Sequence, residues 1–171
     1  SAIGPFAVDE GLIAADGGEV RVRIHNTNTG KIIHAFFPVD NGRARVAGDL
    51  RIPGIADPGA PIRLEFLDPG GASTGRLLPT GEAAQWLDVP GTGRVRVSMV
   101  DAANACVFVN PEVLGLGGIE MPADLSARPD VLQVLEHIRV QASLAMGIAA
   151  TPDEARARRM IPFVGMVSPA Q

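Results

Sequence analysis

Four residues of the sequence lie at two corners of small polar residues, one between two strand-like segments and one ahead of both. They are Asp101, Asn104, Thr80 and Gly81. Two alanines separate the first pair, and such small residues let a ligand approach the backbone, while Asp and Asn supply acceptors and donors. Two such corners in one sheet would form a wall of a substrate pocket. Ordinary turns are the alternative interpretation, because the same residue types predominate in turns.

Two predicted strands have to position these residues. Residues 94–100 alternate between apolar and polar side chains, with Val95, Val97 and Met99 on one face, which predicts a half-buried strand. Residues 105–109 are almost wholly apolar, which is typical of a strand covered on both faces. Asp101 and Asn104 are then expected where one buried strand turns into the next.

A long helix is predicted over residues 129–147, as the centre of the second half of the chain. Pro129 suits its first position, Asp130 suits its positive end and Gly147 can end it. Its apolar stripe consists of Val131, Val134, Leu135, Ile138, Ala142 and Ala145. Val140 and Leu144 lie on the far side, so we expect a second element to cover the helix there. A helical turn at 111–114, a short helix from Thr151 and a strand at 163–167 complete this half.

The first half predicts a helix over residues 1–13, then a hairpin of strands at 20–25 and 32–39 joined by turn residues. A short strand or bridge at 43–48 and another strand at 62–66 follow. Proline and glycine are concentrated between residues 53 and 61, which is typical of a linker. We therefore predict two parts, with residues 1–48 ending a first domain and residues 49–171 forming most of a second.

Composition narrows the classes of partner. The chain has 171 residues, a net charge of −4 and only 4% aromatic residues, which argues against nucleic acid or an anionic membrane as partner. No apolar run reaches the roughly 18 residues of a membrane span. A single cysteine cannot form an internal disulfide, so we expect a cytoplasmic protein.

No complete catalytic set is evident from the residues alone. Cys106 is a possible nucleophile or base, but it stands in an apolar run, where a thiol is expected to be buried and inert. The three histidines lack metal-ligand spacing to any carboxylate or cysteine, so no metal site is expected. The sequence also lacks a Gly-x-Ser-x-Gly elbow.

Several motifs nevertheless resemble one family from end to end of the chain. They are the segments 77–81 (LLPTG), 97–104 (VSMVDAAN) and 107–109 (VFV), with 3–8 (IGPFAV), 68–75 and 135–147 in register. They resemble the PrpF family of 2-methylaconitate cis–trans isomerases and related 4-oxalomesaconate tautomerases. The resemblance implies an α+β fold like that of diaminopimelate epimerase. In that fold each of two domains is a curled, mainly antiparallel sheet around a central helix, with the active site in the cleft between them.

The resemblance also carries departures. The family's catalytic lysine, and the cysteine of its Asn-Cys-Gly-Asn motif, would both lie before Ser1, and neither Lys31 nor Cys106 occupies their positions. Ala105 stands where the family usually has proline after Asn104. In epimerase relatives the corresponding asparagine faces the substrate. The resemblance therefore makes Asn104 the first expected substrate-binding residue, with Thr80, Gly81 and Asp101 beside it, and no catalytic residue in this chain.

We therefore predict a middle fragment of an isomerase that moves a proton across an allylic system in an aconitate-type substrate. Neither a metal nor an organic cofactor is expected. The expected partner is a small di- or tricarboxylate, with a homodimer or the missing parts of its own chain as further partners. Two alternatives remain from the sequence: a non-catalytic β-rich binding module, and an amino-acid racemase or epimerase of the same fold.

Overall fold

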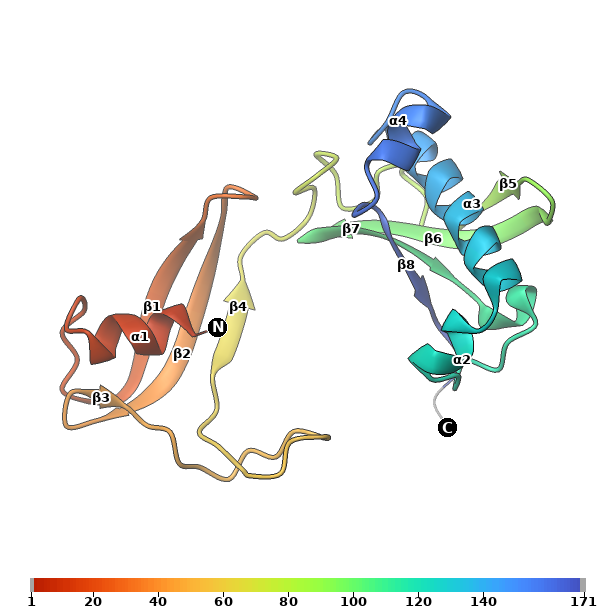
Figure 1. Cartoon of the computed structure of the whole chain (residues 1–171). Coiled ribbons are helices and arrows are strands. Elements are labelled where there is room, and N and C mark those ends of the chain that lie inside the picture. Colours follow the sequence, from red (N-terminus) through yellow and green to blue (C-terminus); the bar gives the residue numbers. More distant parts are fainter. Residues whose placement is uncertain (1, 170–171) are drawn as a thin grey trace. The chain divides into compact units, whose positions relative to one another are not determined.

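The computed structural model describes residues 2–169 and divides the chain into two compact units (Figure 1). The first unit extends to Asp68 and the second begins at Pro69. Each unit has one four-stranded sheet and a hydrophobic core of its own. The chain is therefore α+β, as the sequence predicts.

The first unit is a short helix packed on a sheet. Helix α1 (Ile3–Asp9) precedes the antiparallel pair β1 (Gly17–Asn26) and β2 (Lys31–Asp40), and the other edge of β2 pairs with β3 (Arg43–Ala44) and β4 (Arg63–Phe66). The helix approaches the sheet closely at Gly4, where an added Cβ would lie 2.7 Å from Cε1 of Phe37. The buried core of this unit consists of Val8, Val22, Ala35, Phe37 and Val39.

The sheet of the second unit has the order β5-β6-β7-β8. Its strands are β5 (Gln85–Val89), β6 (Gly93–Ala102), β7 (Asn104–Val109) and β8 (Phe163–Met166). The first three are antiparallel, and β8 runs parallel to β7. Burial alternates along β6 and β7, so one face of the sheet carries the core and the other is partly exposed.

Helix α3 (Pro129–Ala145) covers the core face of this sheet (Figure 1). Its side chains Val131, Ile138 and Ala142 pack in one cluster with Val97, Val107 and other strand residues. Val140, on the other side of the helix, is buried with Ala149 and Ala155. The remaining elements are the 3-10 turn η1 (Pro111–Leu114), α2 (Pro122–Ser126) and α4 (Pro152–Ala157). The predicted central helix with two covered sides is confirmed.

The boundary between the units differs from the one predicted at residues 48 and 49. Residues 63–66 form β4, which pairs with residues 33–36 of β2 and therefore belongs to the first unit. The linker-like composition of 53–61 marks a long loop inside that unit. Composition detects such a breaker-rich loop, but it cannot tell that the chain returns afterwards to the same sheet.

Smaller differences concern single elements. Strand β5 and helix α2 were not predicted, and helix α1 ends at Asp9 rather than Ile13; Ser1, also placed in that helix, lies outside the described residues. Residues 105–109 are not covered on both faces, because Cys106 and Phe108 are only half-buried. Ala145 is exposed, and Met146 takes its place in the core.

Among residues 2–169, no helix combines the length and hydropathy needed to cross a membrane.

Candidate functional site

A loop of residues 69–81, called the site loop below, is fastened to the end of strand β6 by main-chain hydrogen bonds. The N–H of Gly71 donates to the carbonyl oxygen of Asp101 over 2.8 Å, and the N–H of Asp101 donates to that of Leu77 over 2.9 Å. The N–H of Ala103 donates to the carbonyl oxygen of Pro69 over 2.7 Å. These three bonds fasten residues 69–77 of the loop to the turn between β6 and β7.

The carboxylate of Asp101 lies inside this corner. Its Oδ2 accepts hydrogen bonds from the backbone N–H groups of Ser73 and Thr74, both at 2.7 Å, and from the Thr74 hydroxyl at 2.9 Å. The residue is fully buried, with 0% of its surface exposed. Its Oδ1 is also buried and has no hydrogen-bond partner among the described residues. The carboxylate thus holds the site loop, and this position does not fit the direct substrate contact that we predicted for Asp101.

The site loop is tightly packed on itself. The N–H of Gly75 donates to the carbonyl oxygen of Gly71 over 3.0 Å. Gly71 has a φ of +75°, and an added Cβ would lie 2.5 Å from the carbonyl carbon of Gly75. Only glycine fits there, because a side chain would meet backbone that cannot move away. This packing and the Asp101 carboxylate both hold the loop in the conformation described.

Asn104 begins β7 on the opposite face of the sheet. It is exposed and lies opposite Ala102, whereas Ala105, the next residue, is buried toward α3. Successive side chains of a strand point to opposite faces, so Asn104 shares its face with Cys106. Its amide makes no hydrogen bond to any described residue. The side chain therefore does not make the backbone hydrogen bond that the ordinary-turn interpretation would give it.

Ala103, between the paired residues Ala102 and Asn104, adopts a φ of +64°. A residue with a Cβ in this left-handed region is strained by about 1–3 kcal/mol, and such strain is concentrated at functional sites. The hydrogen bond from Ala103 to Pro69 helps to hold this conformation. This left-handed residue turns the chain directly from the end of β6 into Asn104.

Thr80 and Gly81 close the site loop. The N–H of Gly81 donates to the carbonyl oxygen of Leu78 over 3.0 Å, and its φ of +83° is one that glycine adopts without strain. The hydroxyl oxygen of Thr80 is buried and has no hydrogen-bond partner among the described residues. The substrate contact of Thr80 and Gly81 stays a prediction. The structure places the carboxylate of Asp101 and the amide of Asn104 on different faces of the sheet.

Cys106 is half-buried rather than buried as predicted. Burial raises the pKa of its thiol above the ordinary value of 9.0, and the nearby negative charge of Asp101 raises it further. A raised pKa keeps the thiol protonated, so Cys106 is not activated as a nucleophile. No group of three or more metal-ligating residues occurs within residues 2–169.

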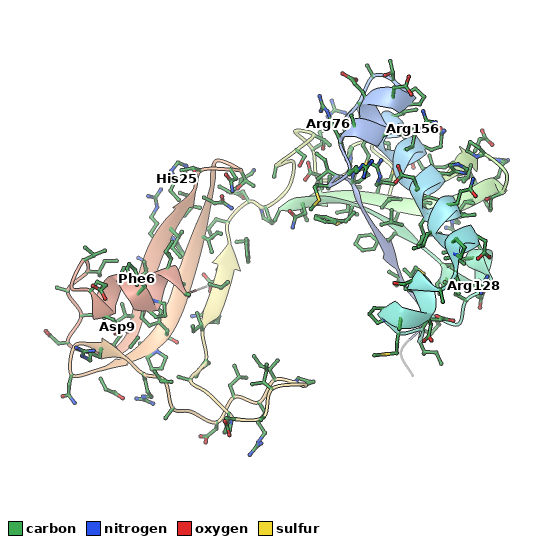
Figure 2. The ribbon with its side chains drawn as sticks, in the orientation of Figure 1. Phe6, Asp9, His25, Arg76, Arg128 and Arg156 are labelled. Atoms are coloured by element: carbon green, nitrogen blue, oxygen red, sulfur yellow. The ribbon has the colours of Figure 1, made fainter. Side chains whose placement is uncertain are left out.

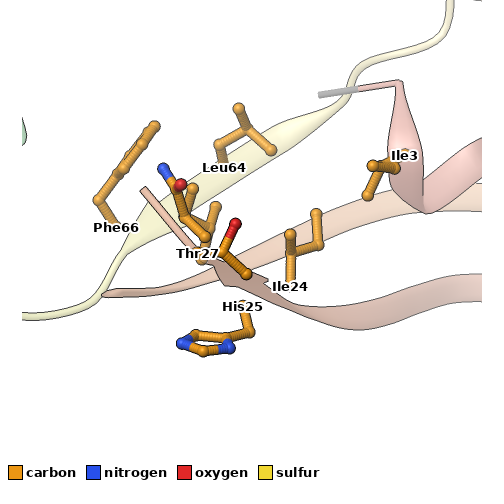
Figure 3. A pocket seen from close by; sticks show the side chains of 8 residues that line it. Ile3, Ile24, His25, Thr27, Leu64 and Phe66 are labelled. Carbon is orange, nitrogen blue, oxygen red and sulfur yellow. The ribbon is translucent and has the colours of Figure 1, made fainter. Parts of the chain in front are cut away.

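A pocket that the sequence did not predict lies in the first unit. It has a volume of about 310 Å³, and Figure 3 shows the side chains that line it. They are Ile3, Ile24, His25, Asn26, Thr27, Ile33, Leu64 and Phe66. Its lining is mostly apolar because the inner face of the sheet ends there, and its polar rim comes from the tip of the β1–β2 hairpin. In the sequence, residues 26–30 have the composition of a hairpin turn. That composition does not show that Asn26 and Thr27 also line a pocket.

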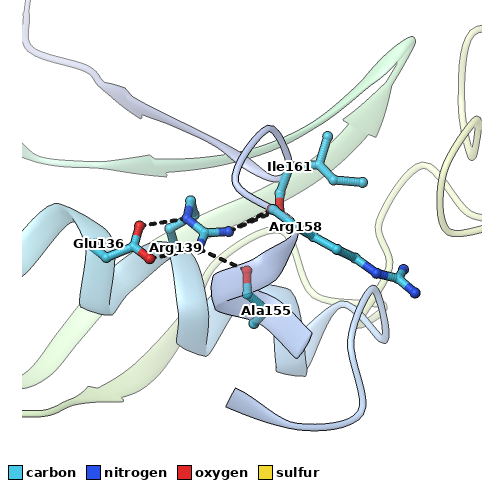
Figure 4. A network of polar contacts seen from close by, with 5 residues as sticks. All are labelled: Glu136, Arg139, Ala155, Arg158 and Ile161. Atoms are coloured by element: carbon cyan, nitrogen blue, oxygen red, sulfur yellow. Dashed lines mark hydrogen bonds and ion pairs between the residues drawn. The ribbon is translucent and has the colours of Figure 1, made fainter. Parts of the chain in front are cut away.

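Arg139 ties the helices of the second unit together (Figure 4). Its guanidinium donates to both carboxylate oxygens of Glu136, each at 2.7 Å, and to the carbonyl oxygens of Ala155, Arg158 and Ile161. The side chain is buried, and all five of its N–H donors have an acceptor. This arginine therefore fixes α4 and the segment leading into β8, and it has no donor left for a ligand.

Comparison with known protein families and solved structures shows which family the chain belongs to. The family profile described as "PrpF protein" matches residues 1–171, so the chain belongs to the PrpF family. A solved structure described as methylitaconate-delta-isomerase is similar with a TM-score of 0.84 and 40% identity, over 95% of this chain and 42% of that one.

Curated relatives include three named isomerases. The chain is 41% identical to 3-methylitaconate isomerase of Eubacterium barkeri, over 95% of this chain and 43% of the relative. It is 35% identical to 2-methyl-aconitate isomerase of Shewanella oneidensis, over 99% and 44%. It is 33% identical to (4E)-oxalomesaconate Delta-isomerase of a Novosphingobium species, over 93% and 43%. The chain thus spans less than half the length of the curated relatives it matches.

Proposed function

We propose that these residues are part of a cofactor-independent isomerase that moves a proton along an allylic system in a di- or tricarboxylate. The observation that carries the proposal is the exposed, unbonded amide of Asn104 on a strained and anchored turn. Support also comes from the relatives, whose names give methylitaconate, 2-methylaconitate and oxalomesaconate as substrates. Asn104 is the residue that we assign first to the substrate, with Thr80 and Gly81 as the second assignment.

The chemistry requires a base that removes a proton next to a carboxylate and an acid that returns a proton two carbons away. Negative charge spreads into the carboxylate between the two steps, and hydrogen-bond donors stabilise it. The amide of Asn104 can donate two such bonds from the edge of a rigid turn. The pKa of the Cys106 thiol is raised, so we do not assign Cys106 as the base.

The same proposal includes location and assembly. A single cysteine supports a cytoplasmic location. Partners would be the substrate and either a second copy or the remaining parts of a family-length chain. Neither nucleic acid nor a membrane fits a net charge of −4 with scattered basic residues.

Turnover by a family-length protein that contains these residues tests the proposal. It should isomerise at least one of methylitaconate, 2-methylaconitate and oxalomesaconate, with solvent deuterium entering the allylic position in an NMR assay. The chain of 171 residues alone should show no turnover above buffer. Racemisation of amino acids without any tricarboxylate turnover would support the epimerase alternative instead. Activity in the 171-residue chain alone would return Cys106 to consideration as the base.

A further inference from the structure

A substrate with two or three carboxylates needs a positive charge in its site, and arginine is the side chain best suited to bind one. The site loop and the turn at 101–104 contain one cationic side chain, that of Arg76. It is exposed and forms no hydrogen bond or ion pair with any described residue. Figure 2 labels Arg76 on the loop that precedes β5. Its charge is therefore available to a ligand.

The backbone that carries Arg76 is held from inside the unit. The Thr74 hydroxyl lies 2.9 Å from Oδ2 of Asp101 and 3.1 Å from the carbonyl oxygen of Arg76. On the other side, the carbonyl oxygen of Leu77 accepts from the N–H of Asp101. Arg76 thus stands between two residues that both bond to one buried aspartate. An arginine on a fixed backbone loses less conformational entropy on binding than one on a mobile loop.

We propose that Arg76 binds a carboxylate of the substrate, and that Asp101 and Thr74 are positioning residues that hold the loop carrying it. This inference rests on the proposed function, because it takes the substrate to be a di- or tricarboxylate. It gives Asp101 a role that its burial permits.

Other exposed arginines of the second unit have different surroundings. The guanidinium of Arg94 lies over the ring of Trp86, 5.3 Å from its centroid. Arg96 lies on β6 and is exposed, far along the strand from Asp101. Arg96 therefore provides a control in which the same charge is removed away from the site loop.

The first experiment measures steady-state kinetics with methylitaconate in a family-length protein. Arg76→Gln should raise KM at least about tenfold, which is the loss of one charge-assisted interaction. The KM of Arg76→Lys should lie between those of the parent and Arg76→Gln, because lysine keeps the charge and loses the bidentate geometry. Arg96→Gln should match the parent. A KM for Arg76→Gln within about twofold of the parent would overturn the binding role.

The second experiment separates positioning from mere stability. Thr74→Val should lower kcat/KM about tenfold, and Thr74→Ser, which retains the hydroxyl, should restore it. Thr151→Val is the matched control, since it removes a hydroxyl that accepts from the N–H of Glu154 at the start of α4. This control should lower Tm and leave the kinetics of the folded protein unchanged. If Thr74→Val also changes only Tm, Asp101 and Thr74 have no positioning role.

Failure of the proposed function is distinguishable from failure of this inference. If the parent turns over none of the three substrates, calorimetric titration with methylitaconate decides. Saturable binding that Arg76→Gln weakens at least about tenfold supports the inference without the isomerase. Absence of binding by the parent, or equal binding by the variant, overturns it.

Discussion

Asp101 and Asn104 lie three positions apart at one hairpin turn, yet their side chains leave the sheet on opposite faces. Asp101 pairs with Ala105 on the face covered by α3, and Asn104 pairs with Ala102 on the open face. The buried carboxylate bonds to the site loop, and the exposed amide bonds to no described residue. One residue of the pair thus builds the corner and the other is available to a ligand.

Replacement of Asn104 by alanine should impair turnover more than folding. In the family-length protein, the loss of one charge-assisted hydrogen bond, about 1.5–3 kcal/mol, lowers kcat/KM about tenfold to a hundredfold. Because the amide has no partner among the described residues, Tm should change little. Kinetics and thermal unfolding of the same preparation check both parts. An unchanged kcat/KM with a clearly lower Tm would remove Asn104 from the site.

The left-handed conformation of Ala103 predicts opposite effects of glycine at two neighbouring positions. Ala103→Gly should be neutral or stabilising, because glycine adopts a φ of +64° without strain. Ala102→Gly, in the strand, should cost about 0.5–1 kcal/mol. Ala103→Val should be the most destabilising, since a β-branched residue is poorly tolerated in that region. Urea unfolding of the three variants checks the order, and equal losses for both glycine variants would contradict it.

Arg139 should be one of the most sensitive charged positions for stability. Arg139→Met leaves the carbonyl oxygens of Ala155 and Ile161 without their donor and should cost about 2–3 kcal/mol. Arg156→Met breaks the exposed pair with Asp153, so a loss within about 1 kcal/mol is expected. Denaturant unfolding compares the two. Similar losses would mean that the buried network contributes no more than a surface pair.

The same network predicts a dependence of stability on pH. Hydrogen bonds from Arg139 hold the pKa of Glu136 below its ordinary value of 4.5. The unfolded chain then binds more protons than the folded one in this range, so the contribution is complete above pH 4.5 and is lost as the pH falls through the lower folded value. The parent should therefore lose more stability on acidification than Glu136→Gln. Parallel pH profiles of both proteins would exclude this contribution.

Cys106 should react slowly despite being half-buried. Because burial and the charge of Asp101 both raise its pKa above 9.0, the rate of maleimide labelling should still be increasing at pH 9.0. At neutral pH the native protein should label more slowly than free cysteine, and denaturant should abolish the difference. Rapid labelling of the native protein at neutral pH would contradict the raised pKa.

Local patterns in the sequence were sufficient for most elements of the fold. Period-two alternation identified β6, and the apolar stripe with Pro129 and Gly147 identified α3. The motif resemblance identified the PrpF family, which the family comparison confirms. These features depend on residues close together in the chain, so they can be seen without knowing how the chain folds back.

What the sequence alone determined is therefore the type of most elements and the residue types at the corner. Only the tertiary structure decided which partners its polar atoms have. Asp101 meets Ser73 and Thr74 across 28 and 27 positions of sequence, and β4 returns to β2 across a loop that resembled a linker. Hydrogen bonds and strand pairings of this kind depend on chain folding over long separations, and local periodicity holds no information about them. For that reason Asp101 appeared to be a ligand contact in the sequence and is a buried anchor in the fold.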